Sequence, residues 1–253
     1  MKKAFIVTSI IDLDNTHPLT YSEVRTHFSS EERFRQTIFT VASLDKICGP
    51  DDTIFLLDAS DNYESYRGAL SYQQNLVFVS VKEEFPEIYK TVRTHSNKSH
   101  CESLSLVKFV EKYRTKLEEY DYFFKMTGRY FTDSSVDVNI FNEDNLNKIF
   151  FKKPFAHEWN DNWNYQMVDR RNIQGDNLLK LYPSVLYSWG RMNLDRIIDI
   201  YRCISVFTEK SQGTVYSFET LLYFFTRVYE SNIIEVDWRV YGWDGTNGTF
   251  MRY

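Results

Sequence analysis

Short runs of β-branched and aromatic residues alternate with segments of helical periodicity along this chain. Residues 4–11 form the first such run, and a helix is expected to begin after Ser29 or Ser30 and to stop at Gly49-Pro50. A second apolar run follows at residues 53–57. Because parallel strands are joined by helical crossovers, this order predicts an α/β protein with a central mixed, mainly parallel sheet flanked by helices.

The same alternation continues towards the end of the chain. Ser99-His-Cys-Glu102 has the spacing of a capping box and predicts that a helix opens there. The remaining elements expected are strands at residues 76–81, 121–126, 148–156, 184–187 and 233–236, and helices at residues 194–207 and 217–229.

Composition narrows the class of protein. The 253 residues are 43% hydrophobic and predict one ordered domain with a sizeable core. A net charge of −5 argues against a protein that coats nucleic acid nonspecifically. Cys48, Cys101 and Cys203 form no Cys-x-x-Cys pair, so neither a disulfide framework nor a zinc site is expected. We expect a cytoplasmic protein without a membrane span, whose only membrane association would be peripheral at the inner face.

The string Lys125-Met-Thr-Gly-Arg-Tyr-Phe131 closes the apolar strand of residues 121–126 and bends at Gly128. Open α/β folds bind ligands at the carboxyl ends of their strands, where this string places Arg129. A fixed guanidinium there suits bidentate binding of a phosphate or diphosphate, beside a backbone that Gly128 lets a ligand approach closely. The alternative is a glycine turn whose arginine pairs with a neighbouring carboxylate.

Four segments together resemble the GT-A-type glycosyltransferases that use nucleotide sugars. The segments are Arg25 with Glu31-Glu-Arg-Phe-Arg-Gln-Thr37, Leu57-Asp-Ala-Ser60, the string from Lys125 to Phe131, and Ser217-Phe-Glu219. The chain is similar to small glycosyltransferase-like proteins of bacterial surface-polysaccharide clusters and of phages. The resemblance covers mainly residues 1–135 and is weaker towards the end.

This resemblance implies a single GT-A-like (Rossmann-like) domain over residues 1–253, with a nucleotide-sugar-binding half at 1–135 and an acceptor-side half at 136–253. It implies a hexosyl- or pentosyltransferase that moves a sugar from a nucleoside-diphosphate sugar, expected to be UDP-linked, to a hydroxyl acceptor, expected to be a surface glycan. Residues implied to bind the donor are Asp58, Lys125, Thr127, Gly128, Arg129 and Tyr130. Two alternatives stay open: Asp58 caps the next turn, and Lys125 pairs locally or reaches the surface.

The chain departs from the wider superfamily at the end of the strand. Many GT-A enzymes carry an Asp-x-Asp motif there, which holds a divalent metal against the sugar diphosphate. Here the strand ends in Thr127-Gly-Arg129, so we expect no metal site and no cofactor other than the nucleotide sugar as co-substrate. Asp12-Leu-Asp14 is better explained as a solvated turn. Were a metal needed, Asp133 and Asp137 would be the other nearby carboxylates.

The acceptor side is expected in the second half of the chain. Glu219 lies in the first turn of a predicted helix and is the candidate base; its alternative is a carboxylate that only stabilises the helix start. Residues 157–165 mix aromatic, amide and acidic side chains, a combination that stacks on sugars and binds their hydroxyls. The acceptor-binding candidates in this segment, with a surface loop as the alternative, are His157, Glu158, Trp159 and Trp163.

Two other functions remain open at this point. One is a noncatalytic carbohydrate-binding protein on the same fold, and the other is transfer of a sugar to a modified base of phage DNA. The glycine-rich segment Gly242-Trp-Asp-Gly-Thr-Asn-Gly248 has neither the Walker A nor the dinucleotide-binding pattern and is expected to fold over the site as a lid.

Overall fold

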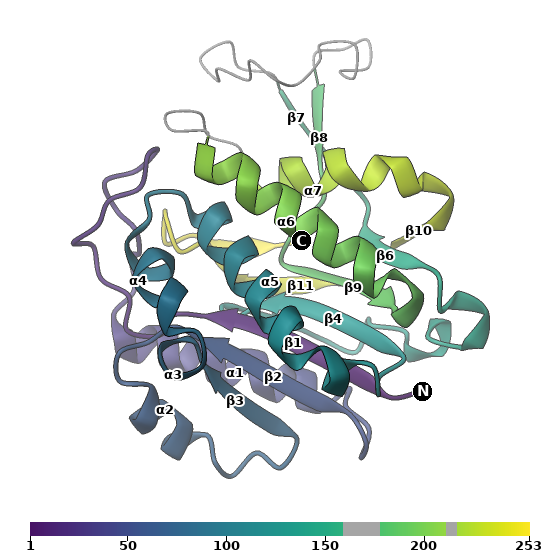
Figure 1. Cartoon of the computed structure of the whole chain (residues 1–253), viewed down its shortest axis with the longest axis horizontal. Helices are drawn as coiled ribbons and strands as arrows, with labels where there is room; N and C mark the ends of the chain where they lie inside the picture. Colours follow the sequence, from purple (N-terminus) through teal and green to yellow (C-terminus); the bar gives the residue numbers. More distant parts are fainter. Residues whose placement is uncertain (159–177, 211–216) are drawn as a thin grey trace.

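The structure, a computed structural model, describes residues 1–158, 178–210 and 217–253. Its centre is a seven-stranded mixed sheet in the order β10-β6-β9-β4-β1-β2-β3 (Figure 1). The strands of this sheet are β1 (Lys3–Ser9), β2 (Thr53–Asp58), β3 (Leu76–Ser80), β4 (Tyr122–Thr127), β6 (Ile149–Lys152), β9 (Leu186–Gly190) and β10 (Ile233–Val236). The predicted α/β class, with a mainly parallel central sheet flanked by helices, is confirmed.

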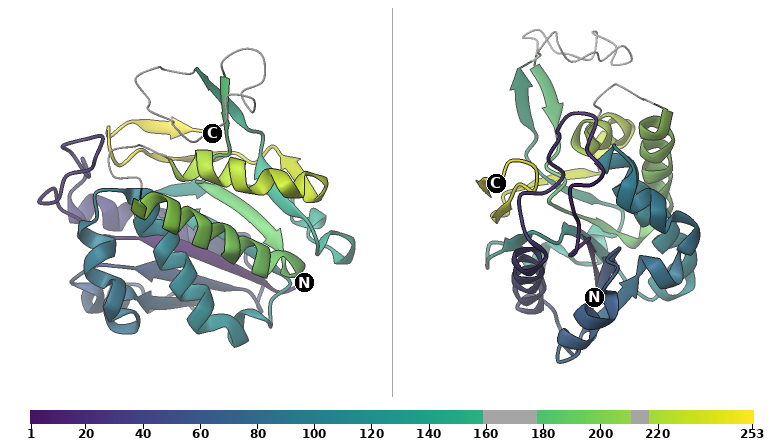
Figure 2. Two further views of the ribbon diagram at one scale, coloured as in Figure 1. Left: turned by 45° about the horizontal axis from the view of Figure 1, so that its top comes forward. Right: turned by 90° about the vertical axis from the view of Figure 1, so that its left-hand side faces the viewer.

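Helices cover both faces of the sheet because its strands alternate buried side chains between two cores. On β1, Ala4 and Ile6 enter one core, and Phe5 and Val7 enter the other. Figure 2 shows α1 on one face and α5 and α6 on the opposite face. The helices are α1 (Ser30–Asp45), α2 (Tyr63–Ala69), α3 (Val81–Glu84), α4 (Pro86–Thr94), α5 (Lys98–Leu117), α6 (Leu194–Lys210) and α7 (Phe218–Thr226), with 3-10 turns at Val138–Ile140, Glu143–Asn145, Arg191–Asn193 and Arg227–Asn232.

The strand order reverses between β1 and β4. From β1 the chain moves outward through β2 and β3, and α5 then returns it to β4 on the other side of β1. Both β2 and β4 pair with β1 in parallel, so the carboxyl ends of β1 and β4 meet, with Thr8 opposite Thr127. A reversal of this kind leaves a crevice outside the strand ends, where open α/β folds bind ligands.

The second half of the chain completes the same sheet and adds two smaller ones. β9 pairs antiparallel with β4 and with β6, so strands from residues 1–135 and 136–253 share one sheet. A three-stranded sheet joins β5 (Tyr130–Thr132), β11 (Val240–Trp243) and β12 (Phe250–Arg252), and a separate hairpin joins β7 (Phe155–Glu158) and β8 (Leu178–Leu181). Among the described helices, none combines the length and apolar character needed to cross a bilayer.

The start of α1 agrees with the sequence, but the start of α5 does not. Ser29 caps α1 and forms a capping box with Glu32. At α5 the predicted box from Ser99 to Glu102 is wrong, because Asn97 is the N-cap and accepts hydrogen bonds from the backbone N–H groups of Ser99 and His100. Helix α5 therefore begins earlier, and Glu102 is free to point into the crevice instead of capping the helix.

Other strand and helix boundaries also differ from those predicted from the sequence. The single strand predicted at 148–156 is two strands, β6 and β7, separated at Lys153-Pro154, because proline cannot donate to a sheet ladder. The strand predicted at 184–187 lies at Leu186–Gly190, and the polar stretch after β3 contains α3 and α4. The glycine-rich tail, expected only as a lid, pairs with β5 as the β11–β12 hairpin.

A substitution at Gly190 would test how tightly the sheet packs against the loop before β6. A Cβ at Gly190 would overlap the backbone carbonyl of Leu146, whereas nothing lies within 4 Å of a Cβ at Gly68 in α2. We expect Gly190→Ala to lower the free energy of unfolding by about 1–3 kcal/mol, the usual cost of overpacking. Gly68→Ala should leave it unchanged or raise it by up to about 1 kcal/mol. Urea denaturation checks both variants, and equal effects would contradict this packing.

Candidate anion-binding site

Two adjoining cavities lie outside the carboxyl ends of β1 and β4. The strand-end cavity, of about 120 Å³, is lined by the ends of β1 and β4 together with α1, α4 and α5. The hairpin cavity, of about 380 Å³, is lined by the start of α7 and by the turn of residues 244–249 between β11 and β12. Lys98, Glu102, Thr127 and Arg129 line both cavities, which therefore meet at these side chains.

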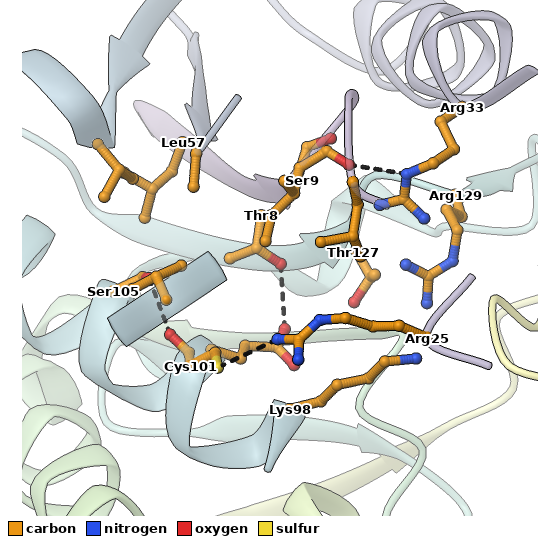
Figure 3. Close-up of a pocket in the computed structure, with 16 residues that line it drawn as sticks. Thr8, Ser9, Arg25, Arg33, Leu57, Lys98, Cys101, Ser105, Thr127 and Arg129 are labelled. Carbon is orange, nitrogen blue, oxygen red and sulfur yellow. Dashed lines mark hydrogen bonds between the residues drawn. The ribbon is translucent and has the colours of Figure 1, made fainter. Parts of the chain in front are cut away.

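Four cationic side chains from four parts of the chain line the strand-end cavity. Arg25 comes from the segment before α1 and Arg33 from α1, while Lys98 is the first residue of α5 and Arg129 follows β4. Figure 3 shows the ends of Arg33, Arg129 and Lys98 gathered on one side of the cavity, with the side chain of Arg25 beside Lys98. We call these four residues the cation cluster.

The two most buried members are held by neutral oxygens. The Nη1 atom of Arg25 donates to the carbonyl oxygens of His95, at 2.8 Å, and His17, at 3.2 Å, and the buried Nε of Arg25 has no hydrogen-bond partner among the described residues. Arg33 donates through Nε to the carbonyl oxygen of Ile10 at 2.7 Å. These residues are only 2% and 4% exposed. Backbone carbonyls thus orient both guanidinium groups without neutralising them.

The two outer members are held by the β11–β12 hairpin. Arg129 Nε donates to the carbonyl oxygen of Trp243 at 3.2 Å, and Lys98 Nζ donates to Thr246 Oγ1 at 2.9 Å. Gly245 lies against the guanidinium of Arg129, since a Cβ there would be 3.1 Å from its Cζ. The hairpin therefore does fold over this part of the crevice and fixes two of the four charges.

Within the described part of the chain, no member of the cation cluster forms an ion pair. Burial, followed by the charge of Arg129, lowers the pKa of Arg33, although a guanidinium stays protonated. Burial, followed by Arg129 and Arg33, lowers the pKa of Lys98 to about 7. Arg33 and Lys98 are therefore destabilised as cations by burial and by neighbouring positive charge, and an anion in the cavity would relieve this repulsion. Carboxylate pairing, the alternative left open for Arg129, is not what the described residues show.

Lys125, a predicted donor-binding residue, is instead fully buried in β4 and lines neither cavity. It forms an ion pair with Glu102 and donates to Thr127 Oγ1 at 2.8 Å and to the carbonyl oxygen of Ser184 at 3.1 Å. Thr8 Oγ1 also donates to Glu102, at 3.0 Å. Local pairing, the alternative left open for Lys125, describes these contacts, and the buried pair fixes Glu102 at the junction of the cavities.

The other residues of the predicted string have separate positions. Thr127 lines both cavities, and Tyr130 lines the hairpin cavity. Gly128 was expected to admit a ligand, but a Cβ there would lie 3.1 Å from the carbonyl oxygen of Thr8 and from Ser9 Cβ. The glycine therefore allows β4 to pack against the end of β1.

Asp58, also predicted to bind the donor, is fully buried and does not line either cavity. Its Oδ1 accepts from the backbone N–H of Ser60 at 2.9 Å, and its Oδ2 accepts from that of Ile11 at 3.3 Å. Burial raises its pKa. These are the contacts of the capping alternative, and they hold together the loops that follow β1 and β2.

The predicted acceptor side is described only in part. Glu219 lines the hairpin cavity and accepts a hydrogen bond from Ser184 Oγ, and Ser217 caps α7 through the N–H of Thr220. His157 and Glu158 lie at the end of β7, which pairs with β8. Trp159 and Trp163 lie outside the described residues.

The carboxylates named as alternative metal ligands all have other partners. Asp12 accepts from Arg93 and from the backbone of Asp61 and Asn62, and Asp14 accepts from Thr16. Asp133 pairs with Arg239, and Asp137 accepts from the backbone of Asn139. Across the described residues, no three His, Cys, Asp or Glu side chains lie together as a metal site would require.

Sequence reasoning missed Arg33, Lys98 and Glu102 as site residues. Arg25 and Arg33 belong to the segments that carry the resemblance, but nothing in the sequence indicated that their side chains reach the same cavity as Arg129.

Comparison with protein-family models and with curated proteins finds no match to this chain. The resemblance therefore stays a prediction.

The pair of Lys125 and Glu102 supports a stability prediction. Glu102→Gln leaves the buried ammonium of Lys125 without its counter-charge and should lower the free energy of unfolding by about 3 kcal/mol, the lower end of the cost of breaking a buried pair. Glu111 is a matched control on the same helix, because its pair with Arg202 is exposed. Glu111→Gln should cost less than about 1 kcal/mol. Similar losses in both variants would show that Lys125 does not depend on Glu102.

Proposed function

We propose that the protein is a glycosyltransferase that moves a sugar from a nucleoside-diphosphate sugar, UDP-linked, to a hydroxyl acceptor, a surface glycan. One observation carries the proposal: four cations that pair with no carboxylate among the described residues converge on a cavity at the point where the strand order reverses. A sugar diphosphate is an anion that would occupy such a cavity and satisfy the free N–H groups of its arginines. The resemblance of the sequence to GT-A enzymes supports the same substrate class.

The cation cluster suits the step in which the donor bond breaks. In glycosyl transfer the bond between the anomeric carbon and the phosphate oxygen breaks, and its electron pair stays on the diphosphate. Fixed guanidinium groups stabilise that developing charge without reorganising during the reaction. We therefore propose that Arg129, with Arg25, Arg33 and Lys98, supplies the charge that a divalent ion supplies in enzymes with an Asp-x-Asp motif.

The hairpin cavity is the proposed acceptor side because it adjoins the cation cluster and contains a carboxylate. Glu219 lies there with Tyr21, Tyr130 and Tyr253. An acceptor hydroxyl that attacks the anomeric carbon must lose its proton, and Glu219 is the proposed group that accepts it. Tyrosine side chains offer both ring faces and hydroxyls to a sugar.

Binding of the diphosphate should depend on the bidentate geometry of Arg129. A thermal-shift panel of UDP and nucleotide sugars first identifies the ligand, and calorimetry in EDTA then measures its affinity. Arg129→Lys keeps the charge but loses the planar fork, and we expect at least about tenfold weaker binding, or roughly 1.4 kcal/mol. Arg239→Lys is the control, because Arg239 is exposed and pairs with Asp133. Equal affinities of the Arg129 variant and the native protein, or binding that requires a divalent ion, would overturn this assignment.

Removal of the proposed base should affect turnover and leave donor binding intact. Glu219→Gln preserves the size of the side chain and should reduce turnover by about 10²-fold or more, with the donor affinity changed less than about twofold. Glu230→Gln, an exposed carboxylate in the 3-10 turn after α7, is the matched control. Full activity of the Glu219 variant would show that Glu219 is not the base and only stabilises the start of α7.

A further inference from the structure

Lys98 is the member of the cation cluster whose charge is least supported by the protein. It is the first residue of α5, so its ammonium lies at the positive end of a 20-residue helix. The only hydrogen bond of its Nζ within the described chain is to Thr246 Oγ1, and the side chain is half-buried. Among the residues that the structure describes, no carboxylate pairs with Lys98 as Glu102 pairs with Lys125.

The charged groups that face Lys98 are mostly positive. Arg129, Arg33 and Arg25 all oppose its charge, and Asp244 of the β11–β12 turn favours it. Asp244 is itself occupied, because its Oδ1 accepts from the backbone N–H groups of Thr246 and Asn247. The other ionisable groups that line the two cavities are Cys101, Glu102, Glu219, Tyr21, Tyr130 and Tyr253.

The nearby carboxylates are committed to other partners. Glu102 pairs with Lys125, and Glu219 accepts from Ser184. Burial and the neighbouring arginines lower the pKa of Lys98 to about 7, so above neutral pH its amine is largely uncharged while the cavity is empty. A diphosphate placed among the same arginines would reverse this balance, because it brings negative charge next to Nζ.

We propose that Lys98 is a further anion-binding residue of this site and that it takes up one proton when a diphosphate binds. The proposal rests on the proposed function, since it assumes that the cation cluster holds a diphosphate. The proton comes from solvent and bonds to the Nζ lone pair, and the resulting ammonium donates to a phosphate oxygen. Above about pH 7, Lys98 therefore adds its charge to the site only when the ligand is present.

Linkage sets the direction of the pH dependence. Below about pH 7 the ammonium is charged with and without ligand. In this range Lys98 therefore does not make the affinity depend on pH. Above that pH it is charged only in the complex, so each unit of rising pH weakens binding by up to about tenfold. The effect ends at the higher pKa that Lys98 has in the complex.

Calorimetry of UDP binding in buffers with different ionisation enthalpies measures the number of protons taken up on binding. The titrations are made at about pH 8, because the second phosphate pKa of about 6 leaves UDP itself fully ionised there. The native protein should take up close to one proton more than Lys98→Met, and Lys98→Arg should bind without that extra proton. Lys90→Met removes an exposed lysine of α4 and should behave like the native protein. The rate at which an amine reagent modifies Lys98 in the free protein, followed by mass spectrometry, should rise with a midpoint near the lowered pKa.

The outcomes separate the two proposals. Equal proton uptake by the native protein and Lys98→Met, or a modification midpoint at the ordinary lysine pKa, overturns the role of Lys98 and leaves the proposed function standing. Failure of both UDP and inorganic pyrophosphate to bind the native protein overturns both.

Discussion

Repulsion among four cations held around one cavity is the constraint around which this end of the molecule is organised. Such charges are unfavourable when buried together, so the fold must hold them by other means. Backbone carbonyls fix Arg25 and Arg33, and the β11–β12 hairpin fixes Arg129 and Lys98. The carboxylates that could neutralise them are engaged elsewhere, as the pair of Glu102 and Lys125 shows. An anionic ligand in the cavity would relieve this repulsion, which is the basis of the proposed function.

The topology explains why residues distant in sequence meet there. The reversal of strand order brings the ends of β1 and β4 together, α1 adds an arginine from one side, and α5 adds a lysine and a glutamate from the other. The last residues of the chain then return to pair with β5 and cover Arg129. The proposed donor and acceptor sides consequently share Lys98, Glu102, Thr127 and Arg129.

Sequence patterns predicted the parts of this arrangement that depend on local chemistry. The strands at β1, β2 and β10, the cap at Ser29 and the placement of Arg129 at a strand end all follow from short segments. The cation cluster does not, because the approach of Arg25, Arg33 and Lys98 to Arg129 depends on pairing between segments far apart. The incorrect capping box at Ser99 shows the same limit: Asn97 competes for the helix start, and the choice between them frees Glu102 to bind Lys125.

The most direct measurement of the central claim is a crystal structure of the protein with UDP. The account predicts that the diphosphate lies in the strand-end cavity, with its oxygens within hydrogen-bond distance of the guanidinium of Arg129, at least one of Arg25 and Arg33, and the ammonium of Lys98. A diphosphate bound away from these groups, with the cation cluster left unoccupied by it, would contradict the account.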